Sequence, residues 1–284
     1  MTRADPITLD RMAVEEAGPN PASLAAAIHD QLVLRVGPIP VHAIAKALDI
    51  VEIRAAATQG LEGALVTTPE RGEGVILVNA VSSPQRQRFT VAHELGHFLN
   101  VWHKPIVGSV AFACTEQDVA TPWRMPPSHA SRHFTQEAEA SRFAIELLAP
   151  AHLVRPALTG IPDLAAVIAL AGALEISREA CARRSVELRD QPTAVVFSRD
   201  GVVRYVERAQ SFPFVSLRKR DRLPALPRPV DASGLSNHEQ ADPQDWLAGS
   251  PREDLIVQML QQQDGYAMTL LALDRTDLSL DEDE

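Results

Sequence analysis

The run His93-Glu94-Leu95-Gly96-His97 constrains this chain more than any other feature of its sequence. Residues four apart on an α-helix lie on one face, about one turn from each other, so both imidazoles can reach a single ion. The glutamate beside the first histidine can then act on a water held by that ion, which is the chemistry of a zinc-dependent peptidase. A helix that buried this acid without a partner would pay a large desolvation cost, so the pattern favours metal binding.

The residues around this motif predict a strand followed by a helix. Residues 75–79 have the apolar character of a short strand. Ser83 is placed to cap a helix that opens with Pro84 and continues to about Asn100. Because Gly96 weakens a helix relative to alanine, we expect another element to approach the backbone closely there.

A catalytic zinc ion takes three protein ligands and keeps one position open, so the motif needs a third ligand. His103 lies six residues after His97, which matches the longer metzincin pattern with Asn100 in the place of its glycine. The rival is Glu137, on a helix predicted over 136–148. A chain that used His103 would be a metzincin-like peptidase.

Helical phase favours Glu137 over His103. Glu137 shares a small, apolar face with Ser141, whereas Glu139 falls on the polar face as a solvated acid. An acid on an apolar face needs a partner, and a zinc ion would provide one. Ser141 lies one turn further on and is predicted to support the second ring nitrogen of a ligand histidine.

Taken together, these motifs resemble the ImmA/IrrE family of bacterial metallo-endopeptidases. The resemblance covers roughly residues 24–156 and is weaker through residue 190. It rests on the strand that ends at Val78-Asn79, on Arg88-Phe89-Thr90, on the histidine motif itself, and on Glu137-x-x-Ala140-x-x-Phe143-Ala144-x-x-Leu147-Leu148-x-Pro150.

The resemblance implies a gluzincin-like zinc endopeptidase that cleaves one regulatory protein, commonly a helix-turn-helix repressor. It implies one zinc ion per chain, Glu94 as the general base, and three ligands, namely His93, His97 and Glu137. The chain differs from the family at Ser141, where asparagine or aspartate is usual. It also carries a long segment between His97 and Glu137, which keeps His103 as the alternative ligand.

The composition narrows the class of protein. With 284 residues and 45% hydrophobic residues, the chain is long enough for two or three domains with sizeable cores. A net charge of −10 disfavours a general nucleic-acid binder. Two cysteines, Cys114 and Cys181, cannot form a disulfide framework, and no apolar leader or membrane span is apparent. We therefore expect a cytoplasmic protein with no membrane partner.

The pattern along the chain predicts an α+β protein of several parts. We expect a flexible arm over 1–19, a mainly helical zinc-peptidase domain with a small sheet over 20–156, a helix-turn-helix-like pair over 157–190, a C-terminal α/β sensor-like module over 191–276, and an acidic tail over 277–284. An edge strand of the small sheet would align an extended peptide substrate by main-chain pairing.

The predicted helix pair leaves a rival from another functional class. Its second helix carries arginines that a DNA-reading helix would expose: Arg178, Arg183, Arg184 and Arg189. Glu179 and Glu187 offset this charge, so packing in support of the peptidase domain is favoured over direct nucleic-acid binding. The rival is a non-catalytic transcriptional regulator that uses the same fold to bind DNA or a repressor. The intact Glu94 favours the enzyme.

Overall fold

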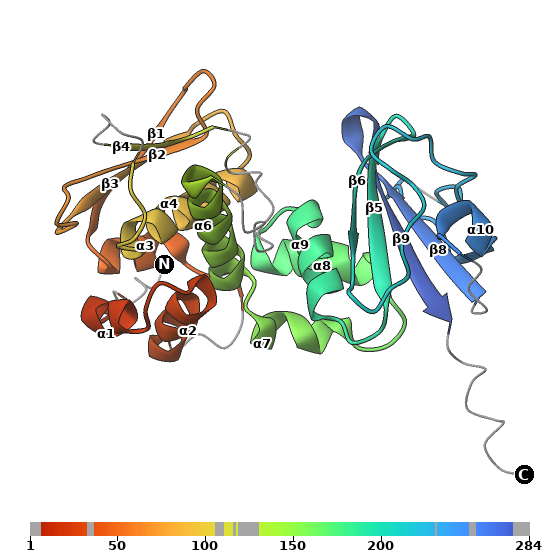
Figure 1. Ribbon diagram of the computed structural model, residues 1–284, viewed down its shortest axis with the longest axis horizontal. Helices are drawn as coiled ribbons and strands as arrows, with labels where there is room; N and C mark the ends of the chain where they lie inside the picture. The colour runs from red at the N-terminus through yellow and green to blue at the C-terminus, as the bar shows by residue number, and fades with distance from the viewer. Residues whose placement is uncertain are drawn as a thin grey trace, which may run out of the picture. The chain divides into compact units, whose positions relative to one another are not determined.

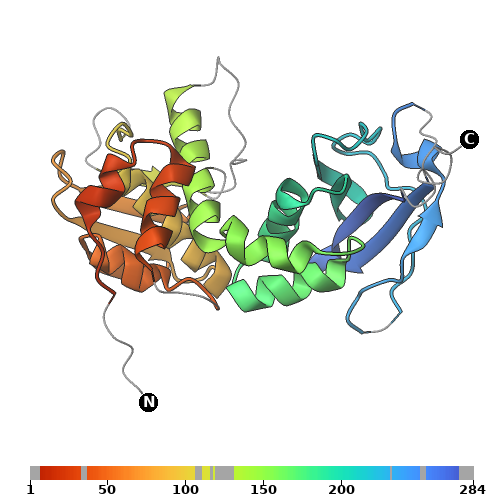
Figure 2. The same ribbon diagram turned by 90° about the horizontal axis from the view of Figure 1, so that it is seen from below.

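The computed structural model describes residues 7–32, 37–105, 111–115, 118, 131–230, 232–249 and 254–274. The chain divides into two compact units, Met1–Pro150 with Ala173–Ser177, and Ala151–Gly172 with Arg178–Glu284. Each unit combines helices with one sheet (Figure 1, Figure 2), which confirms the predicted α+β class. The predicted tail over 277–284 and the first residues of the predicted arm lie outside the described residues.

The first unit contains a four-stranded sheet with an edge strand that the sequence did not predict. The strands are β1 (Ile50–Ala56), β2 (Gly63–Thr67), β3 (Gly74–Asn79) and β4 (Ala111–Cys114), in the order β1-β3-β2-β4. β1 pairs with β3 in parallel, while β2 pairs antiparallel with β3 and with β4. The register of β4 sets Cys114 opposite Gly63 of β2.

The helices of this unit are α1 (Arg11–Glu16), α2 (Pro21–Gln31), α3 (Val41–Ala47), α4 (Pro84–Leu99) and α6 (Arg132–Leu148). α4 carries the histidine motif and begins where the sequence predicts, because the Ser83 side chain caps it and Pro84 opens it. α6 begins earlier than predicted, because Ser131 accepts a hydrogen bond from the amide of Phe134. α4 packs against β2, β3 and α6, so its buried face lies between the sheet and α6 (Figure 1).

Gly96 lies where α4 packs on α6. A Cβ atom at this position would lie 2.9 Å from Phe143 Cδ1 and 3.3 Å from the Cα atom of Ala140. Both neighbours belong to α6, and the second is backbone, so the expected close approach is confirmed. The absence of a side chain at Gly96 lets the two helices meet at this distance.

A buried arginine ties the end of α4 to the chain that follows. The Arg71 side chain donates hydrogen bonds to four carbonyl oxygens, those of His97, Phe98, Asn100 and His103. Several of these are carbonyls that the end of a helix leaves without a partner. Burial, followed by the nearby charge of Arg11, lowers the pKa of Arg71 to about 10, so the guanidinium stays charged at neutral pH.

The second unit contains a five-stranded antiparallel sheet. Asp200 and Gly201 join its first two strands with φ values of 51° and 74°, which suits a two-residue hairpin turn. The strand order is β6-β5-β9-β8-β7. The strands are β5 (Thr193–Arg199), β6 (Val202–Arg208), β7 (Glu239–Ala241), β8 (Asp254–Gln261) and β9 (Tyr266–Asp274). The helical elements are α7 (Ala151–Val154), η1 (Arg155–Leu158), α8 (Leu164–Leu174), α9 (Arg178–Leu188), α10 (Pro243–Trp246) and η2 (Gln263–Gly265).

The arginines of α9 do not form the exposed face that the sequence suggested. α9 packs against β5 and β6 of its own unit. Arg184 is 1% exposed and lies 2.9 Å from Glu187, and Arg183 lies 3.5 Å from Glu207 of β6. Arg183 and Arg184 are therefore not exposed as a DNA-reading helix would require, because each is paired with an acid within the unit.

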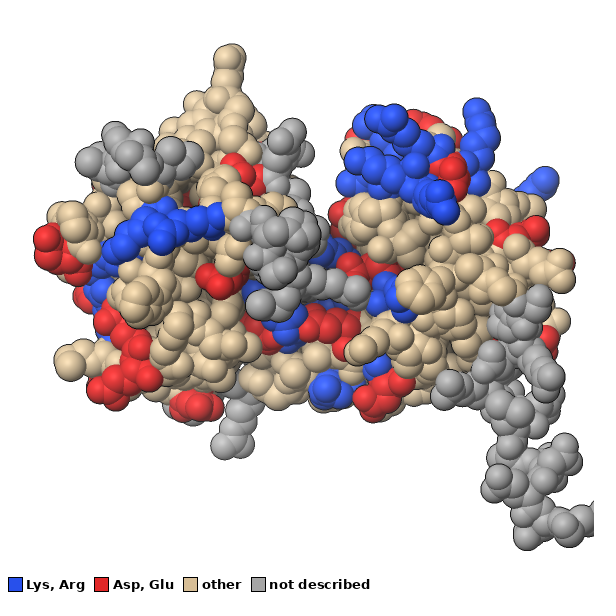
Figure 3. Space-filling model, in the orientation of Figure 1, with Lys and Arg blue, Asp and Glu red and all other residues tan. Residues whose placement is uncertain are grey.

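Basic side chains gather instead beside the turn between β5 and β6. The segment 218–223 hydrogen-bonds to this turn and to the start of β6 through backbone groups, among them Leu223 N to Gly201 O at 2.9 Å. Figure 3 shows lysines and arginines gathered on this unit. The exposed basic residues here include Arg199, Arg218, Lys219, Arg220 and Arg222. In the part of the chain that the structure describes, no helix has both the length and the apolar character that crossing a membrane requires.

We expect Gly96→Ala to lower the free energy of unfolding by about 1–3 kcal/mol, because the added methyl group meets backbone and ring atoms of α6. Gly172→Ala is the matched control. Gly172 is also helical and a Cβ atom there would meet nothing within 4 Å, so alanine should raise stability by up to about 1 kcal/mol. Urea unfolding of both variants measures the difference. A Gly96→Ala protein as stable as Gly172→Ala would contradict the close approach.

Candidate metal centre

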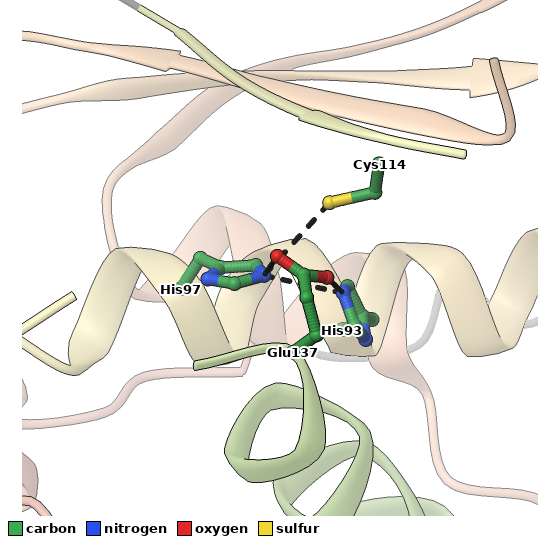
Figure 4. A group of neighbouring side chains, drawn as sticks. All are labelled: His93, His97, Cys114 and Glu137. Carbon is green, nitrogen blue, oxygen red and sulfur yellow. Dashed lines mark hydrogen bonds and ion pairs between the residues drawn. The ribbon is translucent and has the colours of Figure 1, made fainter. Parts of the chain in front are cut away.

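Four buried donor atoms converge between α4, α6 and β4. They belong to His93 and His97 of α4, Glu137 of α6 and Cys114 of β4, and all lie within 4.8 Å of one another (Figure 4). His93 Nε2 lies 3.1 Å from Glu137 Oε2 and 3.2 Å from His97 Nε2. His97 Nε2 lies 3.4 Å from Glu137 Oε1 and 3.8 Å from Cys114 Sγ. Three elements that are distant in sequence therefore aim their donors at one point.

The chemistry of this donor set fits a metal ion. Imidazole nitrogen, carboxylate oxygen and cysteine sulfur are the three kinds of protein ligand that zinc takes. The Nε2 atoms of His93 and His97 face each other, and neither ring is exposed. Burial lowers the pKa of His97 to about 3 against the opposing effect of Glu137, so this ring is neutral and can offer a lone pair. The four residues could thus hold a metal ion.

Glu137 supplies the negative charge of the group. Burial by itself would raise its pKa, but its hydrogen bonds with His93 and His97 and their proximity outweigh burial. The pKa of Glu137 therefore lies below its ordinary value, and the side chain is ionised at neutral pH although it is only 3% exposed. An ionised carboxylate among buried groups requires strong partners.

Glu94 lies on the same helix with its carboxyl group facing β2. A Cβ atom at Gly63 would lie 2.6 Å from Glu94 Oε1, so a side chain at that position of β2 would displace the acid. Glu94 is fully buried, and within the described residues neither of its oxygens lies in hydrogen-bond geometry with a partner. Burial raises the pKa of Glu94 well above its ordinary value; the Cys114 thiol acts in the opposite direction, and the charge of Glu137 adds to the rise.

The outer ring nitrogens of both histidines also have neighbours. Ser141 Oγ, which the sequence suggested for this contact, lies 3.3 Å from His93 Nδ1. His103 Nδ1 lies 2.9 Å from His97 Nδ1. His103 therefore contacts the nitrogen of His97 that faces away from the four donors, and it is not one of the convergent group.

The structure brings two further residues to the site and changes the interpretation of a third. Cys114 reaches the donors because β4 pairs with β2. Glu139 is not simply solvated, since its Oε2 lies 2.8 Å from His103 Nε2. His133 lies 3.6 Å from Glu137 Oε1 and keeps 44% of its side chain exposed, which marks a side of the group that solvent reaches. Its spacing of four residues from Glu137 on α6 is the signal that could have identified it.

We expect zinc to stabilise the protein through this group. At a free zinc concentration one hundred times the dissociation constant, the free energy of unfolding should rise by about 2.7 kcal/mol. His93→Ala should abolish the gain, and so should a chelator added to the wild type. His42→Ala, an exposed histidine of α3, is the control and should keep the gain. Thermal unfolding with and without zinc, alongside elemental analysis, measures the effect; equal stabilisation of the His93→Ala variant would contradict this site.

Comparison with known proteins places this site in a family context. Residues 45–106 match the family model Peptidase_M78, described as the IrrE N-terminal-like domain. No curated protein matches the chain. A solved structure named "Mycobacterium tuberculosis transcriptional regulator" is similar with a TM-score of 0.52 and 13% identity, over 92% of this chain and 80% of that one. At this identity the likeness concerns the fold alone. The matched segment contains the histidine motif of α4, and this match supports the resemblance of residues 45–106 to the ImmA/IrrE family.

Proposed function

We propose that this protein is a zinc-dependent endopeptidase that acts on a specific regulatory protein, such as a helix-turn-helix repressor. The observation that carries the proposal is the convergence of two histidines and an ionised carboxylate beside an unpartnered acid, Glu94. The matching family model bears the name of a peptidase family. The similar solved structure is named as a transcriptional regulator, which supports a partner in gene regulation.

In this mechanism His93, His97 and Glu137 would hold the zinc ion. When bound, zinc would polarise the scissile carbonyl and lower the pKa of a water toward neutrality. Glu94 would accept the proton of the attacking water and return it to the leaving amine nitrogen. Among the described residues, no hydrogen-bond partner of its two oxygens competes for this proton. The positive charge of a bound zinc ion would oppose the rise that burial causes in the pKa of Glu94.

The sheet offers a place for an extended substrate. β4 is an edge strand of its sheet, and its last residue, Cys114, lies among the donors. A peptide that pairs with this edge would run beside the group and could place a scissile bond near it. The half-exposed His133 lies at the solvent-reached side of the same group and could contact the substrate there.

Cys114 favours a second candidate, a regulator without turnover. Structural zinc sites are closed by four protein ligands, and Cys114 would complete such a set with His93, His97 and Glu137. The exposed basic cluster beside the β5–β6 turn would suit an anionic partner of such a regulator. Glu94 is the observation against it, because a closed site has no use for an unpartnered buried acid.

We expect Glu94→Gln to keep stoichiometric zinc and to lose cleavage by a factor of about 10² to 10⁴, because the amide cannot accept the proton of water. Since the substrate is not identified, the probe is a protein extract of the source organism, in which new N-termini are counted after incubation. Glu52→Gln, an exposed acid of β1, is the control and should cleave as the wild type does. Undiminished cleavage by Glu94→Gln would overturn the mechanism.

We expect Cys114→Ser to retain zinc and to cleave at least as well as the wild type, because three other ligands hold the ion. Cys181→Ser, the other buried cysteine, is the control. The absorption spectrum of the cobalt-loaded wild type would show whether Cys114 binds the metal, because a thiolate ligand adds a sulfur-to-cobalt charge-transfer band. If Cys114→Ser released zinc as readily as His93→Ala does, Cys114 would be a permanent ligand, and the closed site of a regulator would replace the peptidase.

A further inference from the structure

We propose that His103 and Glu139 form a positioning pair that selects the tautomer of His97 and thereby prepares it to bind metal. This role depends on the proposed function in one respect, which is that His97 is a metal ligand. Neither residue belongs to the four convergent donors, and both act through His97. His103, whose spacing from His97 matches an alternative ligand, would thus support His97 without binding the ion.

The three side chains form a chain of hydrogen bonds from the surface to the donor group. Glu139 Oε2 lies 2.8 Å from His103 Nε2, and His103 Nδ1 lies 2.9 Å from His97 Nδ1. A carboxylate only accepts, so the contact with Glu139 favours a proton on His103 Nε2. Its Nδ1 then offers a lone pair and accepts the Nδ1–H of His97. The Nε2 lone pair of His97 is left free to face the donor group.

Asn100 favours the opposite tautomer of His103, so Glu139 is needed to keep the proton of His103 on Nε2. The side-chain nitrogen Nδ2 of Asn100 also lies 2.9 Å from His103 Nε2. If Asn100 donated to that nitrogen, His103 would carry its proton on Nδ1 and donate to His97 Nδ1. His97 would then hold its proton on Nε2, pointing at the donors, where it blocks metal binding. The Glu139 carboxylate opposes this tautomer because it would face an unprotonated Nε2.

The surrounding chain holds His103 in this place. His103 is 2% exposed, and its carbonyl accepts a hydrogen bond from Arg71. The next residue is tied to α6 from both sides: Lys104 N donates to Gln136 Oε1 at 2.7 Å, and Gln136 Nε2 donates to Lys104 O at 3.0 Å. The segment after α4 is therefore fastened to the helix that carries Glu139. Such support argues that the contact is built into the fold.

The test compares variants at position 139 in the full-length protein. Glu139→Ala should weaken zinc binding by about 10- to 100-fold, which is the usual cost of losing a group that orients a ligand. Glu139→Gln should lose much less, because the amide oxygen can still accept from His103 Nε2. Glu146→Ala removes an acid that pairs with Arg142 on the same helix, and it is the matched control for charge. Zinc dissociation constants come from competition with a chromophoric chelator, and circular dichroism checks that each variant is folded.

A second readout, nitrogen-15 NMR of the histidine rings in the metal-free protein, reports the tautomers directly. Glu137 favours the opposite tautomer, because a proton on His97 Nε2 would face Glu137 Oε1, 3.4 Å away. We therefore expect a larger share of the His97 proton on Nδ1 in the wild type and in Glu139→Gln than in Glu139→Ala. An unchanged tautomer together with wild-type zinc affinity in Glu139→Ala would overturn the pair. Because this measurement needs neither zinc nor substrate, it separates a failure of the pair from a failure of the proposed peptidase.

Discussion

The packing of α4 on α6 at Gly96 is the contact on which the donor group depends. His97 follows Gly96 directly on α4, and Glu137 lies one turn before Ala140, the residue whose backbone faces Gly96. Zinc–nitrogen bonds are about 2.0–2.1 Å long, so ligands from two helices must approach one ion within a narrow range. A side chain at Gly96 would push α6 away and separate His97 from Glu137, which lie 3.4 Å apart. Gly96 therefore lowers the stability of α4 relative to alanine, but it allows α4 and α6 to approach closely enough for their side chains to bind one ion.

The parts of the site that follow from local periodicity could be predicted, and those that follow from pairing between distant segments could not. The start of α4 could be predicted from Ser83 and Pro84, and its buried face from the spacing of the two histidines, since helix capping and periodicity depend on neighbouring residues. The place of Cys114 among the donors could not be predicted in this way. Its strand, β4, is four residues long and is defined by pairing with β2, which lies far away in the sequence. His103 was noticed for its spacing, yet the spacing could not say which ring nitrogen of His97 it would meet.

The charge balance around Glu137 supports a cation in the group. Its described partners are histidines, namely His93, His97 and His133. His97 is neutral at physiological pH, because burial lowers its pKa to about 3. A neutral imidazole offers one dipole, which compensates only part of the desolvation of a buried carboxylate. A divalent ion would compensate the rest of the desolvation cost of the carboxylate. It would also accept the lone pairs of the two Nε2 atoms that face each other, so one ion would stabilise both features.

The family match ends at residue 106, so it does not include two of the four convergent donors, and only the geometry of the fold brings them to the histidine motif. Two histidines one turn apart occur on helices that bind nothing, and the matched segment contains only two of the four convergent donors, His93 and His97. The acid on α6 lies beyond it, as do Cys114 and Glu139. What turns the motif into a candidate centre is that these later segments return to it: α6 brings an ionised carboxylate to the inner nitrogens, and Glu139 acts through His103 on an outer one. A helix that only needed to pack on α4 would have no reason to direct Glu137 toward His93 and His97 and Glu139 toward the histidine that contacts His97.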